Sequence, residues 1–105
     1  MKYKIIAADL DGTLLNSNGE LSRDNLSAIR TLASLGAHFV PASGRSLSEI
    51  PEILRNEETI RYYIHSSGAG LYDKATGENI SFGFPKELSK TLFRMIFSSD
   101  CHVTV

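Results

Sequence analysis

The sequence predicts an α/β fold built on a parallel sheet. Three short apolar runs, at 3–8, 38–42 and 62–65, have the length and composition of strands. Segments with helical spacing separate these runs, and strands that alternate with helices favour parallel pairing through right-handed crossovers. A chain of 105 residues, 42% of them hydrophobic, has the size and composition of one globular domain.

The first strand and its helix are bounded by clear signals. Because 3–8 is a continuous apolar run, we expect this strand to be covered on both faces. Residues 10–20 are rich in Asn, Ser and Gly and predict a loop. Ser22 is a favourable N-cap for the following helix, and Gly36 stands where a helix commonly ends.

The second strand, 38–42, leads through a small-residue turn to a short helix. Two serines compete as its N-cap. Ser46 would place Pro51 where an interior amide is needed, whereas Ser48 places Pro51 in the tolerated first turn. The sequence therefore predicts a helix capped by Ser48 that runs to about Arg55.

The remainder of the chain predicts a hairpin, a helix and the start of a strand. The third strand, 62–65, is followed by two short strand segments that flank a turn at 74–77. Pro85 is expected as the first residue of an amphipathic helix, and His102 begins a last strand. We expect the phenylalanines of this part to lie in the core and its lysines to be solvated: Phe82, Phe84, Phe93, Phe97, Lys74, Lys86 and Lys90.

Charge and cysteine content narrow the functional classes. The 11 basic and 12 acidic residues give a net charge of −1 without a basic block, so neither nucleic-acid binding nor an electrostatic membrane anchor is indicated. The apolar run before Asp9 is too short for a membrane span. The single cysteine, Cys101, cannot form an internal disulfide, which favours a reducing compartment and a cytoplasmic location.

Two aspartates, Asp9 and Asp11, stand at the end of the first strand. Two carboxylates this close are electrostatically costly without a cation or a proton between them. Gly12 allows a sharp turn, and Thr13 adds a hydroxyl and an amide. Such a site suits Mg²⁺ and phosphate. The alternatives are a solvated turn and a calcium loop, but Leu14 occupies the position where a calcium loop needs glycine.

Ser43 and Gly44 follow the second strand directly. The carboxyl ends of parallel strands meet at one edge of a sheet, so this hydroxyl and amide are expected beside Asp9, where they can bind phosphate oxygens. Arg45 is compatible either with substrate binding or with a surface ion pair. A turn of small residues is by itself weak evidence for a phosphate site. Its position directly after a parallel strand strengthens that interpretation.

Residues 9–14 resemble motif I, DxDGTL, of the haloacid dehalogenase-like phosphohydrolases. The surrounding sequence, from Lys4 to Glu20, resembles the Cof-type branch of that superfamily. Residues 42–45, Ala-Ser-Gly-Arg, stand where this branch carries motif II, most often with Thr in place of Ser43. Ser67 departs from the commoner Asn of an Asn-Gly-Ala segment.

The resemblance implies a partial Rossmann-like core at 1–81, with three parallel strands, and the beginning of an inserted α+β cap domain at 82–105. It implies a Mg²⁺-dependent phosphomonoester hydrolase that acts through an aspartyl-phosphate. Asp9 would be the nucleophile and Asp11 the general acid and base, and both would hold Mg²⁺. The expected phosphate contacts are Gly12, Thr13, Ser43, Gly44 and Arg45.

The substrates implied by this branch are sugar phosphates or other small phosphorylated metabolites. The resemblance breaks off before the family's motif III lysine and motif IV acidic loop, so we expect the 105-residue chain to be incomplete for catalysis. An exposed sheet edge would then favour self-association. Two alternatives stay open: a phosphomutase of the same superfamily, and a non-catalytic truncated fragment or degenerate subunit.

Overall fold

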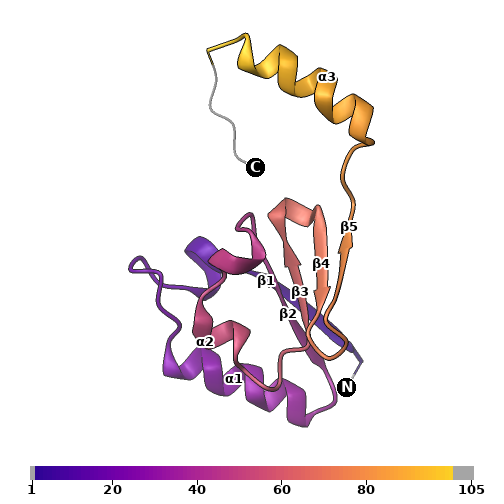
Figure 1. Cartoon of the computed structure of the whole chain (residues 1–105). Helices are drawn as coiled ribbons and strands as arrows, with labels where there is room; N and C mark the ends of the chain where they lie inside the picture. The colour runs from indigo at the N-terminus through magenta and orange to yellow at the C-terminus, as the bar shows by residue number, and fades with distance from the viewer. Residues whose placement is uncertain (1, 101–105) are drawn as a thin grey trace.

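A computed structural model of the chain describes residues 2–100, in which five strands form one sheet and two of the three α-helices pack on it (Figure 1). The strand order follows the sequence, and the first three strands are parallel while the last two continue the sheet antiparallel. The predicted α/β class and the three parallel strands are therefore confirmed. The strands are β1 (Ile5–Asp9), β2 (His38–Ala42), β3 (Tyr62–His65), β4 (Gly70–Asp73) and β5 (Glu78–Ser81).

The core lies between one face of this sheet and two helices, α1 (Arg23–Ser34) and α2 (Glu52–Arg55). Ile29 of α1 and Leu54 of α2 belong to the same buried cluster as Phe39, on β2. Both helices therefore cover the same face, as Figure 1 shows. The limits of α1 match the prediction, since Ser22 Oγ accepts the Asn25 amide at 3.1 Å and Gly36 follows with φ +82°.

The prediction that β1 is covered on both faces is wrong. Burial alternates along the strand, with Ile6 and Ala8 packed against the core while Ile5 is 65% exposed. Both helices pack on the face of the sheet that carries Ile6 and Ala8, so the face that carries Ile5 is left uncovered. The strand also has no neighbour on its outer edge within residues 2–100.

The predicted helix between Ser48 and Arg55 is two separate turns. A 3₁₀ turn, η2 (Leu47–Glu49), precedes Pro51, which then occupies the N-cap position of the four-residue α2. Proline cannot supply an interior amide, so the chain restarts its helix after Pro51. Ser46, and not the expected Ser48, is the N-cap residue of η2, and its Oγ donates to the Glu49 carboxylate at 2.7 Å.

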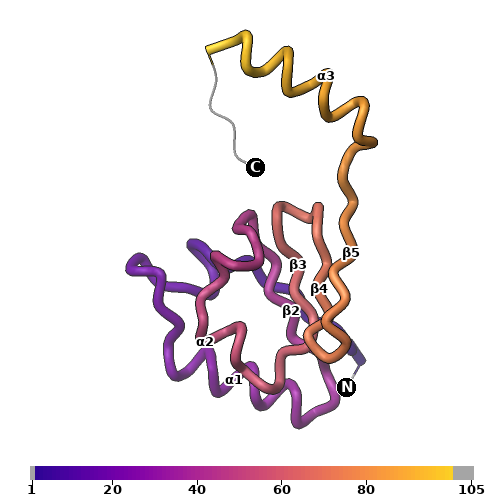
Figure 2. Tube along the Cα trace, viewed as in Figure 1, coloured from indigo at the N-terminus to yellow at the C-terminus, as the bar shows by residue number. Residues whose placement is uncertain are grey.

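The helix α3 (Lys86–Phe97) stands apart from the sheet, at the end of the segment that follows β5 (Figure 2). No residue of α3 is buried. The expectation of core phenylalanines is therefore wrong, because they belong to the segment that leaves the sheet and are exposed: Phe82, Phe84, Phe93 and Phe97. The expected strand at His102 and the residue Cys101 lie outside the described residues.

Between residues 2 and 100 the longest helices have 12 residues, and none has the length and apolar character required to cross a bilayer.

Candidate active site

The first half of the site is the turn that follows β1. Asp9 ends the strand, and its Oδ1 accepts the backbone amide of Leu10 at 2.9 Å. Leu10 is fully buried and opens a helical turn, η1 (Leu10–Leu14), which closes with the Leu15 amide on the Leu10 carbonyl at 2.9 Å. Gly12 has φ +75° there, so the glycine is required by the backbone conformation. A buried leucine therefore anchors a turn that leaves the Asp9 carboxylate at the surface.

The second half is the turn that follows β2. Asp9 is paired in register with Ala42, so Ser43 and Gly44 emerge next to the Asp9 carboxylate. Ser43 is only 6% exposed, and its amide donates to the Ile64 carbonyl of β3 at 3.0 Å. The Ser43 hydroxyl oxygen accepts the Arg45 amide at 3.0 Å, which leaves the hydroxyl proton for another acceptor.

A hollow of about 330 Å³ joins these two halves. Three residues that the sequence marked as site residues line it together: Asp9, Ser43 and Gly44. The sheet contributes Ala42 and Ile64 to the wall. The predicted convergence at the carboxyl ends of β1 and β2 is therefore present in the fold, and we call this space the Asp9 hollow.

The remaining wall is Ser67 and Gly68, which the sequence did not single out as functional. They belong to a short turn after β3, η3 (Ser66–Gly68), where Ser66 and Ser67 take the left-handed φ values of 52° and 56°. The Ser67 amide donates to the Ser43 carbonyl at 3.1 Å. The same rule that placed Ser43 at the site applies to the end of the third parallel strand and would have found Ser67.

Ser67 also explains why residue 44 is a glycine. A Cβ at Gly44 would lie 3.3 Å from Ser67 Oγ, which is tighter than an ordinary contact. The glycine therefore lets the hydroxyl lie close to the backbone that lines the Asp9 hollow.

Asp11 and Arg45 form an ion pair instead of lining the hollow. Arg45 Nη2 donates to Asp11 Oδ1 at 2.7 Å and Arg45 Nε to Oδ2 at 2.9 Å, a bidentate arrangement. A third bond runs from Arg45 Nη1 to the Glu49 carbonyl at 2.9 Å. The hydrogen bonds from Arg45 hold the pKa of the Asp11 carboxyl below its ordinary value. Of the two expected roles of Arg45, the structure thus shows the surface ion pair.

Gly12 and Thr13 also lie outside the wall of the Asp9 hollow. Thr13 is exposed and lines a separate space of about 210 Å³ with Asn16 and Asn25. Asn25 Nδ2 donates to the Leu14 carbonyl at 3.0 Å and so fastens this turn to α1. The expected contact of Gly12 and Thr13 with a phosphate therefore requires a ligand that reaches from the Asp9 hollow to the turn after β1.

Asp9 and Asp11 contribute oxygen donors, the kind that Mg²⁺ prefers. Within residues 2–100 no three His, Cys, Asp or Glu side chains gather as a metal site. Mg²⁺ commonly takes only one or two carboxylates and completes its shell with water and substrate phosphate, so the Asp9 side chain and the turn behind it fit that ion. The Asp11 carboxylate is held by Arg45, which leaves Asp11 its backbone carbonyl as the available donor.

The arrangement combines a carboxylate, a hydroxyl and backbone amides at the carboxyl edge of parallel strands. Hydroxyl and amide donors stabilise an oxyanion, and a carboxylate at the same hollow can attack it or hold its counter-ion. The geometry therefore suits an anionic ligand of phosphate size.

Comparison with known proteins gives a consistent assignment. Residues 6–105 match the haloacid dehalogenase-like hydrolase family. The chain is 36% identical over 70 residues to phosphatase YwpJ of Bacillus subtilis, covering 67% of this chain and 25% of that protein. It is 34% identical over 70 residues to 5-amino-6-(5-phospho-D-ribitylamino)uracil phosphatase YcsE of the same organism, covering 67% and 28%.

A solved structure shares the fold. The haloacid dehalogenase-like hydrolase from B. subtilis superposes with a TM-score of 0.75 at 30% identity, covering 90% of this chain and 33% of the other. The chain spans only 25% to 38% of the length of the curated relatives it matches.

Proposed function

Because the chain belongs to the haloacid dehalogenase-like hydrolases, we propose that the Asp9 hollow serves the Mg²⁺-dependent hydrolysis of phosphate monoesters through an aspartyl-phosphate. The observation that carries this proposal is the meeting of the Asp9 carboxylate with the Ser43 hydroxyl and the Gly44 backbone in one hollow. A phosphoryl transfer needs a nucleophile on one side of phosphorus and donors around its oxygens, and this hollow offers both.

The reaction proceeds in two displacements. In the first, an Asp9 carboxylate oxygen forms a bond to phosphorus, the bond from phosphorus to the ester oxygen breaks, and Asp11 gives a proton to the leaving oxygen. In the second, water attacks phosphorus, Asp11 takes the water's proton, and the bond between Asp9 and phosphorus breaks. Bound Mg²⁺ supplies positive charge that reduces the repulsion between the Asp9 carboxylate and the phosphate.

The Asp11–Arg45 pair sets the order of events. Asp11 cannot serve the leaving oxygen while both of its oxygens accept from Arg45. Release of Arg45 when the substrate binds would let Asp11 take up from solvent the proton that it then gives to the leaving oxygen. The release would also leave the guanidinium available for the phosphate, the role expected from the sequence. Arg45 would then act in turn as partner of the resting Asp11 and as phosphate contact.

Small phosphorylated metabolites, including sugar phosphates, are the proposed substrates, and the proposed location is the cytoplasm. The name of YcsE describes a phosphatase acting on a metabolite of this kind, which supports hydrolysis over phosphomutase chemistry. We propose that substrate selection belongs to a cap domain that begins near residue 82, where the chain leaves the sheet (Figure 1). The exposed helix α3 would be part of that cap.

Asp9→Asn tests this function in a preparation that hydrolyses p-nitrophenyl phosphate. The variant keeps the shape of the side chain but removes the nucleophile, so turnover should be lost while the fold is kept. The matched control is Asp24→Asn, a change at an exposed aspartate in the first turn of α1. Turnover by Asp9→Asn within about tenfold of the parent chain would rule out Asp9 as nucleophile, because a lost nucleophile costs far more.

A further inference from the structure

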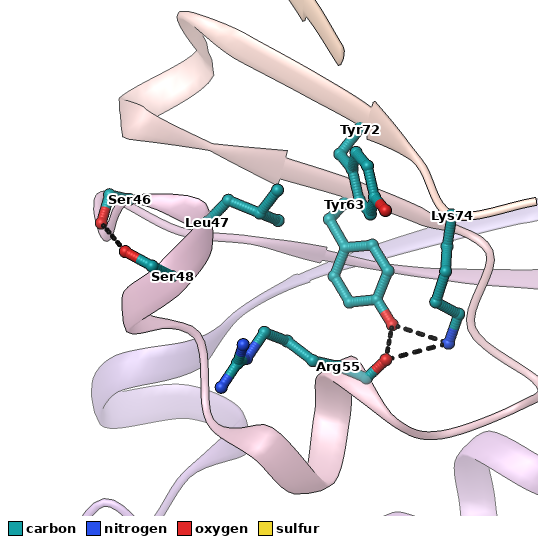
Figure 3. Close-up of a pocket in the computed structure, with 7 residues that line it drawn as sticks. All are labelled: Ser46, Leu47, Ser48, Arg55, Tyr63, Tyr72 and Lys74. Atoms are coloured by element: carbon teal, nitrogen blue, oxygen red, sulfur yellow. Dashed lines mark hydrogen bonds between the residues drawn. The ribbon is translucent and has the colours of Figure 1, made fainter. Parts of the chain in front are cut away.

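The largest hollow of the chain, about 580 Å³ between the segment η2–α2 and the strands β3 and β4, belongs to the packing of the fold (Figure 3). Tyr63 on its wall is only 1% exposed. Lys74 corrects the expectation of a solvated lysine. Its Nζ donates to the Glu57 carbonyl at 2.7 Å, the Arg55 carbonyl at 3.1 Å and the Tyr63 hydroxyl at 3.1 Å. All three ammonium protons are used within the fold, so this space offers a ligand neither a free ammonium nor the Tyr63 ring.

The Asp9 hollow, in contrast, extends across the ends of three strands. Asp9 ends β1, Ser43 and Gly44 follow β2, and Ser67 and Gly68 follow β3. Neighbouring strands lie about 4.8 Å apart, so the ends of β1 and β3 are separated by about 10 Å. The volume of about 330 Å³ lies at the lower end of the range for sites that hold whole small molecules. The hollow therefore has room for more than the phosphoryl group that Asp9 would attack.

The Ser67 hydroxyl is the hydrogen-bonding side-chain group at the β3 end of the hollow. Ser67 is exposed, and its Oγ has no hydrogen-bond partner among residues 2–100. The Oγ lies toward the Gly44 backbone, since a Cβ placed at Gly44 would be 3.3 Å from it. The hydroxyl therefore stands at the wall of the hollow with its proton and its lone pairs available to a ligand.

The turn that carries Ser67 is held in a strained conformation. Ser66 and Ser67 both have left-handed φ values, 52° and 56°, which are unfavourable for residues with a side chain. The Ser66 amide donates to the Arg45 carbonyl at 2.7 Å. The Ser67 amide donates to the Ser43 carbonyl at 3.1 Å. These bonds fasten the turn to the end of β2, so the position of Ser67 is set before a ligand binds.

His65 braces the same turn from the sheet. Its ring is buried, with Nδ1 3.0 Å from Ser66 Oγ and Nε2 2.9 Å from Asn79 Oδ1 of β5. Gly70 carries no side chain where this ring lies. Strained residues persist where the surrounding structure holds them, and they gather at ligand sites. The strain and the brace thus indicate that the turn has a role in ligand binding.

We propose that Ser67 binds the leaving group of the substrate and favours neutral, hydroxyl-bearing alcohols, such as those of polyol and sugar phosphates. This inference rests on the hydrolysis proposed for the Asp9 hollow. A phosphoryl group bonded to Asp9 and held by Ser43 lies over the ends of β1 and β2, so the part of the ligand that reaches Ser67 is the alcohol beyond the ester oxygen. Besides Asp9, no charged side chain of residues 2–100 lines the hollow, so a second anionic group would find no partner there. One specificity contact thus lies on the core, in addition to the proposed cap.

A matched pair of phosphonates tests the proposal, because their carbon–phosphorus bond is not hydrolysed as an ester. Dihydroxypropylphosphonate and propylphosphonate differ only in two hydroxyl groups. Each is titrated, with Mg²⁺ present, into the ¹⁵N-labelled 105-residue chain, and nuclear magnetic resonance shifts at the amides of Ser43 and Gly44 report binding. The dihydroxy compound should bind about two- to tenfold more tightly, the contribution of one hydrogen bond between neutral groups.

Two substitutions remove the Ser67 hydroxyl. Ser67→Gly suits the left-handed backbone and should bind the two phosphonates equally, with the affinity of the parent for propylphosphonate. Ser67→Ala keeps a side chain and should lose the preference in the same way. The control Ser27→Ala removes an exposed serine hydroxyl on α1, outside the hollow, and should keep the preference of the parent.

A preference that the parent shows and both Ser67 variants lose supports the proposal. The proposal is overturned if the parent binds the two phosphonates equally, or if both variants keep the preference for the dihydroxy compound. If neither phosphonate nor inorganic phosphate shifts the amides of Ser43 and Gly44, the anion site of the Asp9 hollow is refuted, and the leaving-group contact with it.

Discussion

Ser43 offers the sharpest quantitative test of the Asp9 hollow. The Ser43 hydroxyl accepts the Arg45 amide and keeps its proton for a ligand, so Ser43→Ala removes one donor to phosphate. A hydrogen bond to a charged group contributes about 1.5–3 kcal/mol, which corresponds to about 10- to 150-fold in phosphate affinity. The variant also leaves the Arg45 amide without its acceptor, at a cost in unfolding free energy of about 1 kcal/mol.

Calorimetric titration of the chain with inorganic phosphate in the presence of Mg²⁺ measures the change in phosphate affinity. Urea denaturation measures the change in unfolding free energy. Ser43→Thr is the matched control because threonine keeps the hydroxyl, and it should retain most of the affinity. An affinity of Ser43→Ala within about twofold of the parent would show that no hydrogen bond to phosphate had been lost, and would refute the role of Ser43.

Three other predictions concern the stability and association of the fold. Gly70→Ala places a methyl group where the His65 ring lies, so it should lower the free energy of unfolding by about 1–3 kcal/mol in urea denaturation, and an unchanged midpoint would contradict the packing. Hydrogen bonds from Arg61 lower the pKa of Asp73 to about 2, below the unfolded value of 3.8. The pair therefore stabilises the fold above that value and loses this contribution as the pH falls from about 4 to about 2, a loss that Asp73→Asn should abolish in acid denaturation. The 105-residue polypeptide should self-associate through the open edge of β1, and light scattering that finds only monomers at all concentrations would exclude this.

The sequence predicted those parts of the fold whose signals are local. Ser22 caps α1 because its side chain meets an amide three residues on, and Gly36 ends the helix because of its own backbone conformation. Neither depends on distant parts of the chain. The three parallel strands followed from the alternation of apolar and helical segments, a pattern that also lies within short windows.

Features set by tertiary contacts could not be predicted. The apolar character of 3–8 does not tell which face of β1 the helices cover, and Ile5 proved exposed. Lys74 lies in a stretch of polar turn residues, yet its ammonium reaches carbonyls that belong to residues 55 and 57. Such contacts depend on how α2 and the hairpin pack together.

The candidate site likewise has one part that the sequence predicted and another that depends on tertiary contacts. The rule that carboxyl ends of parallel strands share one edge brought Asp9 and Ser43 together from the sequence alone. The bidentate pair of Asp11 and Arg45 joins residues 34 positions apart and depends on side-chain geometry that no motif encodes. Ser67 follows the third parallel strand, so the same rule also applies to this residue, which the sequence analysis did not assign to the site.

Chemical trapping at Asp9 tests the central claim most directly. A preparation that hydrolyses p-nitrophenyl phosphate is incubated with acetyl phosphate and Mg²⁺, reduced with borohydride, digested and sequenced by mass spectrometry. An aspartyl-phosphate is reduced to homoserine, so the account predicts homoserine at position 9, and none there in Asp9→Asn. Homoserine at Asp11 or at another aspartate, with Asp9 unmodified, would contradict the assignment of the nucleophile.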